Sequence, residues 1–554
     1  MAVVSISRIQ IRRGRKNEGS GLPQLAGGEL AWAVDTQEMF IGNGSVAEGA
    51  PFVGNTKLLT EKDNILAFAK SYEYKSTNDS IQTGPGLTPI QRSLQDRLDD
   101  IVSITSFNAL GDGSDQTDQI QRAITQLYMN PNDPLNNSNR VILQMLPGNY
   151  VVSRTIVLPS FVNIVGSGID NTVLTKTTPG PVFRTVSDVD IPLINQLNAT
   201  DLAAYVNSSA VTETNQSRNI HISDMTIDVA GSAGGFLLNS VRDSEFRNIK
   251  IRGTWTNGST LDNTNYGIKM TMVTTAGVGK NNTFQNIKFE GLSVGVYSDN
   301  DIEDNRLSEC SFETHYNGIA FGTNQLLGAT AATTGPRSTK VNNCRFKNID
   351  RQAIYIKYGE YNISQSNSFI DVGYQWTAGV IQKNNPQWPV IEFGTEAFAN
   401  GSDNDYFNRT PQLSADQNYL SNIAYIPEIK GPGFDTVRYL QELNLTQSTS
   451  PSVMFKIPAD ETKCIEIEYT YKSFTVNAFR KGVITVVSNP SNNIRSVSDE
   501  YDYVGDALYE ENLVFGSESF DENLDGVVDS LGISVLNLTI NDQSEFHYRL
   551  KTAR

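Results

Sequence analysis

The densest group of acidic side chains in this sequence lies between positions 299 and 313 and consists of Asp299, Asp301, Glu303, Asp304 and Glu313. Two carboxylates that face one groove can cleave a glycan, one as the acid and the other as the nucleophile or base. They must lie about 5 Å apart for retention of configuration and further apart for inversion. In an acidic chain such a run is also typical of a solvated turn. We therefore predict no catalytic residue, and these five are the candidates if the chain is a glycoside hydrolase.

Other catalytic motifs are missing from the sequence. A polysaccharide lyase would need Ca²⁺ and a basic proton acceptor, and a polygalacturonase-like site would need a Gly-His-Gly motif, which does not occur. The three histidines, His221, His315 and His547, are isolated, and we interpret each as a structural residue. No G-x-S-x-G, H-E-x-x-H or P-loop motif is present. Enzymatic activity stays open, and the sequence favours a protein without it.

A calcium loop is a further candidate site near the C-terminus. Positions 1, 3, 5 and 9 of an EF-hand-like loop are Asp521, Asn523, Asp525 and Asp529. Position 12, where an EF-hand has a bidentate Glu, is Gly532. We therefore interpret the stretch as a turn rich in Asp and Gly, and we predict no metal and no cofactor.

Three aromatic residues could contact a sugar. Trp376 and Trp388, together with Tyr374, come from an irregular stretch and could stack on sugar rings. Packing at a domain junction explains them equally well. The sequence leaves both interpretations open.

The net charge of the chain, -17, argues against a general nucleic-acid-binding surface, because phosphates are held by clustered Lys and Arg. The basic cluster Arg12, Arg13, Arg15 and Lys16 is interpreted as a solvated or partner-facing turn. The sequence contains no apolar run of membrane-spanning length and no signal peptide, so we expect no membrane insertion and synthesis in a cytosol. Cys310, Cys344 and Cys464 are interpreted as buried thiols.

The elements that must position these residues begin with a small β hairpin module. The stretch 28–44, GELAWAVDTQEMFIGNG, contains two short β-type runs separated by a turn. With the preceding IQIRRG it resembles the N-terminal domain of phage tropism determinants and tail fibres, over about residues 6–55. The resemblance implies attachment to a virion through residues that include Gly28, Glu29, Asp35, Thr36, Phe40, Gly42 and Gly44.

Residues 58–105 are predicted to form a helical neck or linker. Apolar residues recur at helical spacing in 59–71 and in 88–105, around a Gly-Pro-Gly break. The stripe Ile90, Leu94, Leu98 and Ile101 could pack against other copies of the chain or within one copy. Both readings of the stripe remain open.

A capped β-helix is predicted to follow. The segment 107–124, FNALGDGSDQTDQIQRAI, combines a Gly-rich turn with an amphipathic helix, and LPGNY and VGSG follow it. This order resembles the opening of the pectate-lyase superfamily domain found in phage tailspikes and polysaccharide-active enzymes. The resemblance implies that the stretch seals one end of a right-handed parallel β-helix, with the cap residues Gly111, Asp112, Gly113, Asp115 and Thr117.

Repeated short strands predict the rungs of that β-helix. Phe289 and Phe312 are 23 residues apart, as are Phe346 and Phe369, which is near one turn of a solenoid. The longer interval from Phe312 to Phe346 predicts an outward loop in the Gly/Ala/Thr-rich stretch 322–338. Stacked rungs would bury Phe on Phe and Cys beside Cys, while Asn at the corners would bond from rung to rung. After Trp376 the pattern becomes irregular.

Alternating strands return from position 440 and predict an antiparallel β-sandwich. We therefore expect a mainly β protein divided into a virion-attachment module 1–57, a neck 58–105, a parallel β-helix 106–430 and a C-terminal sandwich 431–554. Its C-terminal part is similar, by weak analogy, to the trimerising or receptor-facing ends of phage fibres.

Together these features predict a structural virion protein, a fibre or spike on a phage tail or neck that takes part in host attachment. We expect a homotrimer, because a slender β-helix with apolar outer columns would be stabilised by parallel neighbours. Its other expected partners are tail or neck proteins bound through the N-terminal module and a host surface glycan. We expect it in the virion after assembly in the host cytoplasm. The alternatives are a tailspike depolymerase and a glycan-binding adhesin without hydrolysis.

Overall fold

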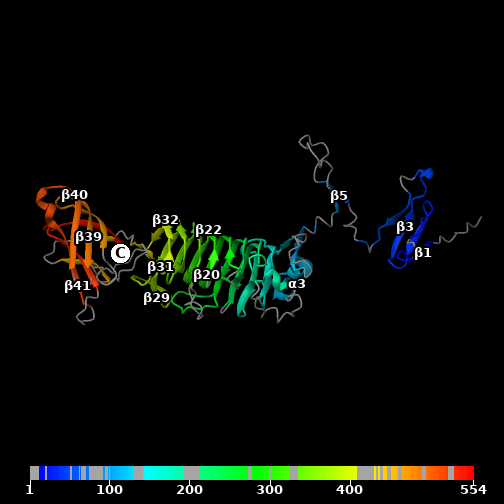
Figure 1. Cartoon of the computed structure of the whole chain (residues 1–554), viewed down its shortest axis with the longest axis horizontal. Coiled ribbons are helices and arrows are strands. Elements are labelled where there is room, and N and C mark those ends of the chain that lie inside the picture. The colour runs from blue at the N-terminus through cyan, green and yellow to red at the C-terminus, as the bar shows by residue number, and fades with distance from the viewer. Residues whose placement is uncertain are drawn as a thin grey trace, which may run out of the picture. The chain divides into compact units, whose positions relative to one another are not determined.

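The computed structural model describes residues 11–18, 22–49, 53–60, 63, 70–73, 91–93, 98, 100–129, 141–191, 211–230, 233–272, 277–298, 301–322, 335–408, 429–431, 434–436, 441–443, 445, 451–458, 464–489, 494–521 and 530–553. It divides into two compact units, residues 1–101 and 102–554 (Figure 1). Among the described residues, no helix combines the length and the apolar character that crossing a bilayer requires.

The first unit contains a four-stranded sheet in the order β1-β2-β3-β4. Its elements are β1 (Arg12–Gly14), β2 (Leu30–Ala33), β3 (Glu38–Gly42), the short 3-10 turn η1 (Val46–Glu48) and β4 (Asn55–Leu58). β2 and β3 pair antiparallel, which confirms the predicted hairpin, and β1 joins β2 in parallel. Leu25, Ala31, Ala33 and Phe40 form the small core of this sheet.

The predicted helical neck is contradicted at residues 70–73, 91–93 and 101–103, which form strands, whereas Leu98 is helical and most of residues 58–105 lie outside the described ones. Residues 70–73 and 91–93 form the antiparallel strands β5 (Lys70–Glu73) and β6 (Gln91–Ser93). β7 (Ile101–Ser103) pairs with the first strands of the β-helix and is followed by the 3-10 turn η2 (Ile104–Phe107). Backbone pairing at the end of a sheet outweighs the weak helical preference of such a short apolar stripe.

The predicted cap helix is confirmed as α3 (Thr117–Tyr128), which packs at the first rungs of the β-helix (Figure 1). Its apolar face places Ile120, Ala123 and Ile124 in the same core as the rungs, each with no exposed surface. The Tyr128 hydroxyl donates to the carbonyl oxygens of Val141 and Asn163, which fixes the end of the helix on two strands. α3 therefore covers a stack end that would otherwise expose unpaired backbone groups.

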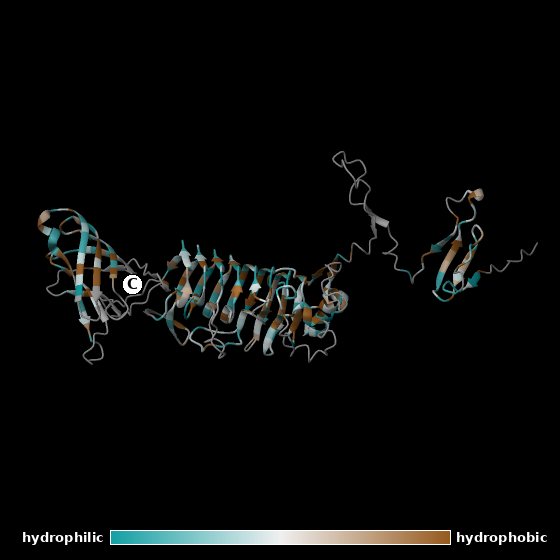
Figure 2. Cartoon of the chain, viewed as in Figure 1, coloured by the Kyte–Doolittle hydropathy of each residue, from teal (hydrophilic) through white to brown (hydrophobic). Residues whose placement is uncertain are grey.

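The body of the second unit is a parallel β-helix, as predicted. Each strand pairs in parallel with the equivalent strand of the next rung, and hydrophobic residues alternate with hydrophilic ones along the strands (Figure 2). The elements that build it are β8 (Asp112–Asp115), β9 (Ile142–Gln144), β10 (Gly148–Val151), β11 (Ile156–Leu158), β12 (Asn163–Val165), β13 (Thr172–Lys176), β14 (Gly180–Thr185), the 3-10 turn η4 (Asp188–Asp190), β15 (His221–Val229), β16 (Ala233–Asn239), β17 (Glu245–Arg252), β18 (Tyr266–Thr271), β19 (Gly279–Lys280), β20 (Thr283–Ser298), β21 (Ile302–Glu303), β22 (Arg306–Ser308), β23 (Ser311–Phe321), β24 (Lys340–Asn342), β25 (Arg345–Ile349), β26 (Ile354–Glu360), β27 (Ile363–Gln365), β28 (Ser368–Val372), β31 (Ile391–Phe398), β32 (Gly401–Asp403) and β33 (Tyr406–Asn408). A side hairpin of β29 (Tyr374–Thr377) and β30 (Val380–Pro386) leaves the stack.

A column of stacked phenylalanine rings runs through the core and confirms the 23-residue spacing. The ring centroids are 4.6 Å apart for Phe289 and Phe312, 4.6 Å for Phe312 and Phe346, and 5.0 Å for Phe346 and Phe369. Phe312 and Phe346 are register partners although 34 residues separate them. Residues 323–334 of the predicted outward loop lie outside the described residues. Phe407 extends the column at 5.1 Å from Phe369, so a further rung follows the stretch after Trp376 whose sequence pattern is irregular.

Buried asparagines at the corners link the rungs, again as predicted. Asn282 Nδ2 donates to Asn305 Oδ1 at 2.9 Å, and Asn362 Nδ2 donates to Asn400 Oδ1 at 2.9 Å. All four side chains are buried. Such ladders satisfy corner amides that no strand can pair. Cys310 and Cys344 are buried on neighbouring rungs as free thiols.

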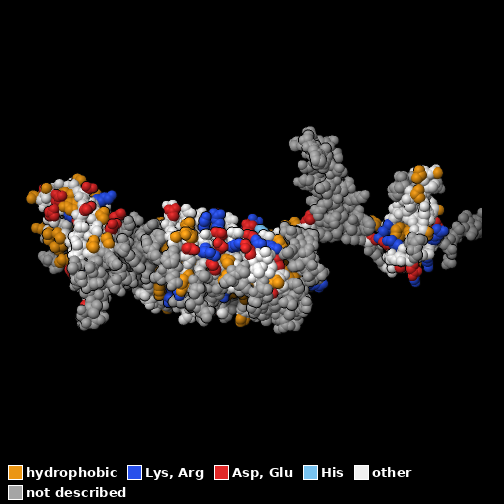
Figure 3. Space-filling view, in the orientation of Figure 1, with side chains coloured by type: hydrophobic (Ala, Val, Ile, Leu, Met, Phe, Trp, Pro, Cys, Tyr) orange, Lys and Arg blue, Asp and Glu red, His pale blue; other side chains and the backbone are white. Residues whose placement is uncertain are grey.

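One outer face of the β-helix, built by β15, β17, β20, β23 and β25, is charged and so does not supply the apolar columns assumed in the trimer prediction. Outward columns on β15, β17, β20, β23 and β25 carry ion pairs between neighbouring rungs, and Figure 3 shows acidic and basic side chains side by side on the face in view. The pairs are His221 with Glu245, Arg252 with Asp228, Lys250 with Glu290 and Lys347 with Glu313. These columns are not apolar, so they give no hydrophobic reason for parallel association. The trimer itself stays a prediction.

Two antiparallel sheets form the C-terminal sandwich, as predicted. β34 (Ile429–Gly431) continues the β-helix from β31 and turns into β35 (Phe434–Thr436), which pairs with β43 (Ser544–Ala553). The larger sheet also contains β36 (Gln441–Leu443), β38 (Cys464–Ser473), β39 (Ala478–Asn489) and β40 (Ile494–Val504). The smaller sheet contains β37 (Ser452–Pro458), β42 (Ser530–Asn537) and β41 (Leu513–Phe520), which follows the 3-10 turn η6 (Ala507–Asn512).

Candidate functional site

The acidic candidates of the β-helix are split between two places. Asp301 Oδ2 lies 3.2 Å and Glu303 Oε2 lies 4.0 Å from the same Arg337 nitrogen. Glu313 belongs to another column, where it pairs with Lys347 at 2.5 Å. Asp304 is an exposed corner residue with a φ of +51°.

Asp301 and Glu303 are therefore the only two members of the group that the structure brings together among its described residues; Asp299 lies outside them. Burial raises the pKa of Asp301, opposed by the nearby Arg337 guanidinium and assisted by Glu303. A carboxyl with a raised pKa beside a second carboxylate is the arrangement of an acid and a base. Here, however, both carboxylates contact the same Arg337 guanidinium, as in a structural ion-pair cluster, and its positive charge offsets one of the two negative charges.

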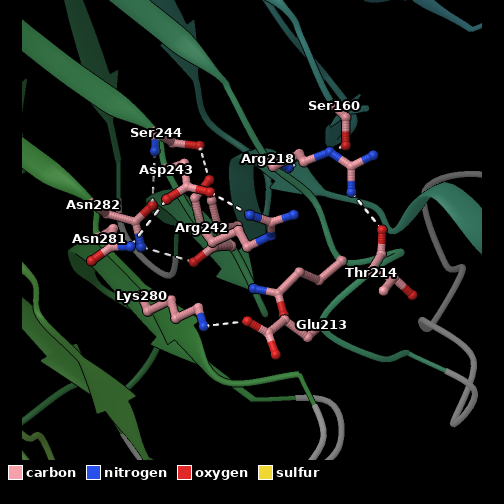
Figure 4. A network of polar contacts seen from close by, with 12 residues as sticks. Ser160, Glu213, Thr214, Arg218, Arg242, Asp243, Ser244, Lys280, Asn281 and Asn282 are labelled. Carbon is pink, nitrogen blue, oxygen red and sulfur yellow. Dashed lines mark hydrogen bonds and ion pairs between the residues drawn. The ribbon is translucent and has the colours of Figure 1, made fainter. Parts of the chain in front are cut away.

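A row of basic residues precedes this corner on successive rungs (Figure 4). Arg218 pairs in parallel with Arg242, which pairs with Lys280, and Glu303 and Arg337 continue the same row. Each cation has an acidic partner, because Arg218 contacts Asp188 at 3.3 Å, Arg242 contacts Asp243 and Lys280 contacts Glu213. The row is therefore internally neutralised and does not form a bare basic stripe.

A second row of equivalent positions carries Tyr316, Arg351 and Trp388. Each lies three residues before a register partner in the set Ile319, Ile354 and Ile391. The Arg351 guanidinium carbon lies 4.7 Å from the centroid of the Tyr316 ring and 4.8 Å from that of the Trp388 ring. All three side chains are half-buried. We call these three residues the aromatic–arginine row.

Aromatic rings and guanidinium donors are groups with which proteins contact hydroxylated ligands, so the aromatic–arginine row is a candidate sugar-binding surface. Of its members, only Trp388 is among the residues that the sequence predicts could contact a sugar. Tyr374 is buried in the core, and Trp376 lies on the β29–β30 hairpin. The three aromatic residues predicted to stack on a sugar, which are these two and Trp388, therefore do not form one binding surface.

A loop over residues 253–265 crosses several rungs beside this row. Its Trp255 packs edge-on against Tyr316 with ring centroids 6.4 Å apart. Its Asn257 amide donates to Asp350 Oδ1 at 2.5 Å and the Gly258 N–H donates to Asp350 Oδ2 at 2.7 Å. Asp350 is thus the anchor that holds the loop against a rung more than ninety residues later in the chain.

Asp350 makes stability depend on pH. Burial raises its pKa to about 6, against the hydrogen bonds from Asn257 and Gly258 and the charge of Arg351. Because the folded pKa exceeds the unfolded one, the stabilisation is complete below about pH 4 and is lost as the pH rises through 6. Urea titrations should show the free energy of unfolding of the wild type falling by about 2 kcal/mol relative to Asp350→Asn between pH 4 and pH 7. An unchanged difference would contradict the prediction.

The histidines are structural where contacts are described. His315 is fully buried, with its ring nitrogens 2.7 Å from the Leu292 carbonyl oxygen and 3.1 Å from that of Phe289, and burial lowers its pKa to about 4. His221 contacts Glu245 on the next rung. His547 lies on β43, paired with Thr470. None of them contacts the aromatic–arginine row in the part of the chain that the structure describes.

Asp35 and Glu38 hold the first unit together. Asp35 accepts the N–H groups of Lys16 and Asn17, each at 2.8 Å. Glu38 accepts from Lys16, Lys57 and the Thr36 hydroxyl, and these bonds lower its pKa to about 2.

Close packing explains several other residues of this module. A Cβ at Gly42 would come 2.1 Å from the Ala26 carbonyl oxygen, and Gly28 and Gly44 have positive φ. Phe40 is buried, and Glu29 pairs with Arg12. Each predicted attachment residue therefore has a structural role inside the module.

The predicted cap residues form one hydrogen-bonded turn. Asp115 accepts hydrogen bonds from the Thr117 N–H and hydroxyl and from the Ser153 hydroxyl. These bonds join the start of α3 to the residues that follow β10. Asp112 accepts from Gln116, and Gly111 has a φ of +67° with Gly148 against it. Gly113 also has positive φ, at +84°.

The candidate calcium loop cannot be compared with the structure as a whole. Asp521 follows β41, and Asn523, Asp525 and Asp529 lie outside the described residues. Within the described residues, no group of three or more His, Cys, Asp or Glu side chains is arranged to hold a metal ion.

Comparison with known proteins gives one family and several distant structures. Residues 101–381 match the model of the family described as rhamnogalacturonase A/epimerase, pectate lyase-like. No curated protein matches.

Among solved structures, ORF18 of Geobacillus virus E2 is 16% identical with a TM-score of 0.36 and 86% of each chain covered. The pre-mature gene product 12 of bacteriophage phi29 is 14% identical with a TM-score of 0.32, covering 60% of this chain and 45% of that one. PfbA, a surface adhesin of Streptococcus pneumoniae, is 12% identical with a TM-score of 0.35, covering 72% and 99%. These likenesses are too distant to indicate a function.

Proposed function

The chain belongs to the rhamnogalacturonase A/epimerase, pectate lyase-like family, and on this premise we propose that it is a structural fibre or spike protein of a phage tail or neck. In this proposal the chain is a homotrimer that takes part in host attachment, and residues 1–57 join it to other virion proteins.

The continuous stack of rungs supports this proposal most directly. The parallel sheet runs from α3 at one end to β34, and β35 then connects it to β43 of the sandwich. A stack of this kind is stiff because each rung is bonded to both neighbours. Four ion pairs between neighbouring rungs add to these backbone bonds on one outer face.

The N-terminal module supports the attachment part of the proposal. It falls in a compact unit separate from the β-helix. Its sequence resembles the N-terminal domain of phage tropism determinants. Its acidic residues Asp35 and Glu38 form hydrogen bonds and ion pairs inside the module. In this proposal, attachment therefore uses the surface of the module as a whole.

The attachment role can be tested with two glycine variants in assembled particles. Gly42→Ala forces a Cβ against the backbone of Ala26, whereas the matched control Gly14→Ala meets nothing within 4 Å. We expect the first variant to be lost from purified virions and the second to be retained, measured by immunogold electron microscopy with antibody against the sandwich. Particles that label equally with both variants, or wild-type particles that do not label, would contradict the proposal.

Glycan binding without cleavage is a second candidate function, supported by the aromatic–arginine row. We expect Arg351→Ala and Trp388→Ala each to weaken binding of host surface glycan about 10-fold, measured by isothermal titration calorimetry. Arg345→Ala, on the outer face of the β-helix, is the matched control. Equal affinity for all four proteins would remove the row as a glycan site.

Cleavage of the glycan is distinguished from binding by its products. A depolymerase would release reducing ends from host glycan, and Asp301→Asn and Glu303→Gln would abolish the release. Saturable binding without reducing ends would identify an adhesin instead.

A further inference from the structure

One dipeptide in the loop over residues 253–265 presents two nitrogen atoms to a single carboxylate. The Asn257 Nδ2 donates to Asp350 Oδ1 at 2.5 Å, and the backbone N–H of Gly258 donates to Asp350 Oδ2 at 2.7 Å. Asn257 Nδ2 also donates to the Asn348 carbonyl oxygen at 2.8 Å. The side-chain amide of the asparagine and the N–H of the following glycine are therefore held against the same acidic group.

An Asn-Gly pair can react with itself. The glycine nitrogen attacks Cγ of the asparagine, a bond between these two atoms forms, the bond from Cγ to Nδ2 breaks, and ammonia leaves. The product is a cyclic imide, which water opens to an aspartyl or an isoaspartyl linkage. Glycine favours the attack because it has no Cβ and its backbone adopts many conformations. In this reaction one proton must leave the glycine nitrogen and one must reach Nδ2.

Asp350 contacts both atoms between which that proton has to move. Its Oδ2 accepts the hydrogen of the attacking Gly258 nitrogen, and its Oδ1 accepts from the Nδ2 that leaves. A carboxylate in this position can take the proton from Gly258 as a general base and return it to Nδ2 as a general acid. Its own charge is then the same at the end as at the beginning. Such hydrogen-bond contact is the first geometric requirement for a general base.

The surroundings of the pair also suit the reaction. The Ser259 N–H donates to the Thr256 carbonyl at 3.1 Å, so Asn257 and Gly258 are the central residues of a tight turn. Gly258 is exposed, which lets ammonia leave and water enter. Asp350 is buried, and burial raises its pKa to about 6. It is therefore ionised at neutral pH and is a stronger base than an ordinary aspartate.

Two other Asn-Gly pairs, both in the β-helix, serve as internal comparisons because their partners are uncharged oxygens. In Asn317–Gly318 the amide donates to the backbone and side-chain oxygens of Gln352, and the glycine N–H donates to the same backbone oxygen. In Asn400–Gly401 the amide donates to the Gly359 carbonyl and the glycine N–H donates to the Asn362 carbonyl. Carbonyl and amide oxygens do not take up a proton at neutral pH.

We propose that the folded chain modifies itself at Asn257, which cyclises onto the Gly258 nitrogen with Asp350 as general base and general acid. The inference goes beyond the proposed function and does not depend on it. A virion protein and an enzyme with this loop would react in the same way.

The reaction products release one end of the loop. A carboxylate at position 257 replaces the donor amide and lies against Asp350, where two negative charges repel one another. The loop keeps its bonds to β20, which it makes through the N–H groups of Trp255 and Asp262. Release is therefore confined to the end that crosses to the rung of Asp350, and it cannot be reversed without a new amide.

Peptide mapping of the incubated full chain by mass spectrometry tests the proposal. Trypsin releases residues 253–269, and fragmentation locates the loss of ammonia within them. We expect Asn257 to react about 10-fold faster than Asn317 or Asn400, and Asp350→Asn to slow the reaction at Asn257 about 10-fold or more. Asp262→Asn is the matched control and should leave the rate unchanged, because this carboxylate of the same loop is bonded to Thr264.

The pH dependence of the wild-type rate is a second test that needs no variant. With Asp350 as the base, the rate rises as the pH passes 6 and then levels, whereas attack assisted by hydroxide rises about 10-fold with each pH unit. Among the described residues, Arg351 and Tyr316 are the charged or titratable groups that face Asp350. The arginine stays protonated, and burial raises the pKa of Tyr316 further from neutrality.

Three results would overturn the inference. The first is an Asp350→Asn protein that reacts at Asn257 as fast as the wild type or faster, because a carboxylate that only restrains the loop would slow an uncatalysed reaction. The second is a wild-type rate that still rises about 10-fold per pH unit above pH 7. The third is an intact Asn257 after a period in which the isolated peptide of residues 253–269 has been fully converted.

Discussion

Replacing Phe312 with alanine is expected to destabilise the protein by about 4 kcal/mol, because it opens a cavity in the middle of the phenylalanine column. The ring is fully buried and stacks on Phe289 and Phe346 at 4.6 Å on each side. It also fills the space above Gly295, where an added Cβ would come 2.6 Å from the ring. Neighbouring rungs are held apart by their backbone pairing, so the stack cannot collapse to close the gap.

The measurement is the free energy of unfolding from urea titration, with the unfolding rate as a second readout. Tyr361→Ala is the control, because this aromatic side chain is 59% exposed at a corner of a later rung and should change the stability by less than about 0.5 kcal/mol. A Phe312→Ala protein as stable as the control would mean that the column does not hold the rungs together.

The second large effect is expected at Asn367, a buried corner residue that links three rungs. Its amide group donates to the Val341 carbonyl at 2.9 Å and its side-chain oxygen accepts from the Cys344 N–H at 2.8 Å. It also bonds to Asp405 of the following rung. Asn367→Leu keeps a similar volume but leaves the backbone groups of two earlier positions without their partners. We expect a loss of about 2 to 4 kcal/mol.

Gln365→Leu is the matched control for this variant. Gln365 is two positions earlier, at the end of β27 on the same rung, but its side chain is exposed and makes one long contact to Asp403. Its replacement should change the free energy of unfolding by less than about 0.5 kcal/mol in the same urea titrations. Similar losses in the free energy of unfolding for both variants would show that introducing leucine on this rung is destabilising in itself. The loss could then not be assigned to the missing hydrogen bonds of Asn367.

Local patterns were enough to predict the parts of the fold in which one residue type must recur. The phenylalanine spacing and the corner asparagines follow from a requirement that every rung repeats, and the cap helix follows from the need to cover the end of the stack. In the predicted neck, Leu98 is helical but Ile101 begins a strand, because a short apolar stripe fits a helix or a strand and pairing with the β-helix decides at its end. Likewise, on the face built by β15, β17, β20, β23 and β25 the outward positions carry paired charges instead of the apolar columns assumed for a trimer.

The sequence by itself determined the fold class of this protein, since glycine, asparagine and phenylalanine at solenoid spacing have few other structures open to them. Only the tertiary structure decided which side chains meet. Tyr316, Arg351 and Trp388 are 35 and 37 residues apart, unlike the 23-residue spacing of the core, because loops of different length leave each rung. Asp301 and Glu303 meet at Arg337 for the same reason. The register of the backbone hydrogen bonds determines which side chains share a column. Because loop lengths vary, this register cannot be predicted from the spacing of residues along the chain.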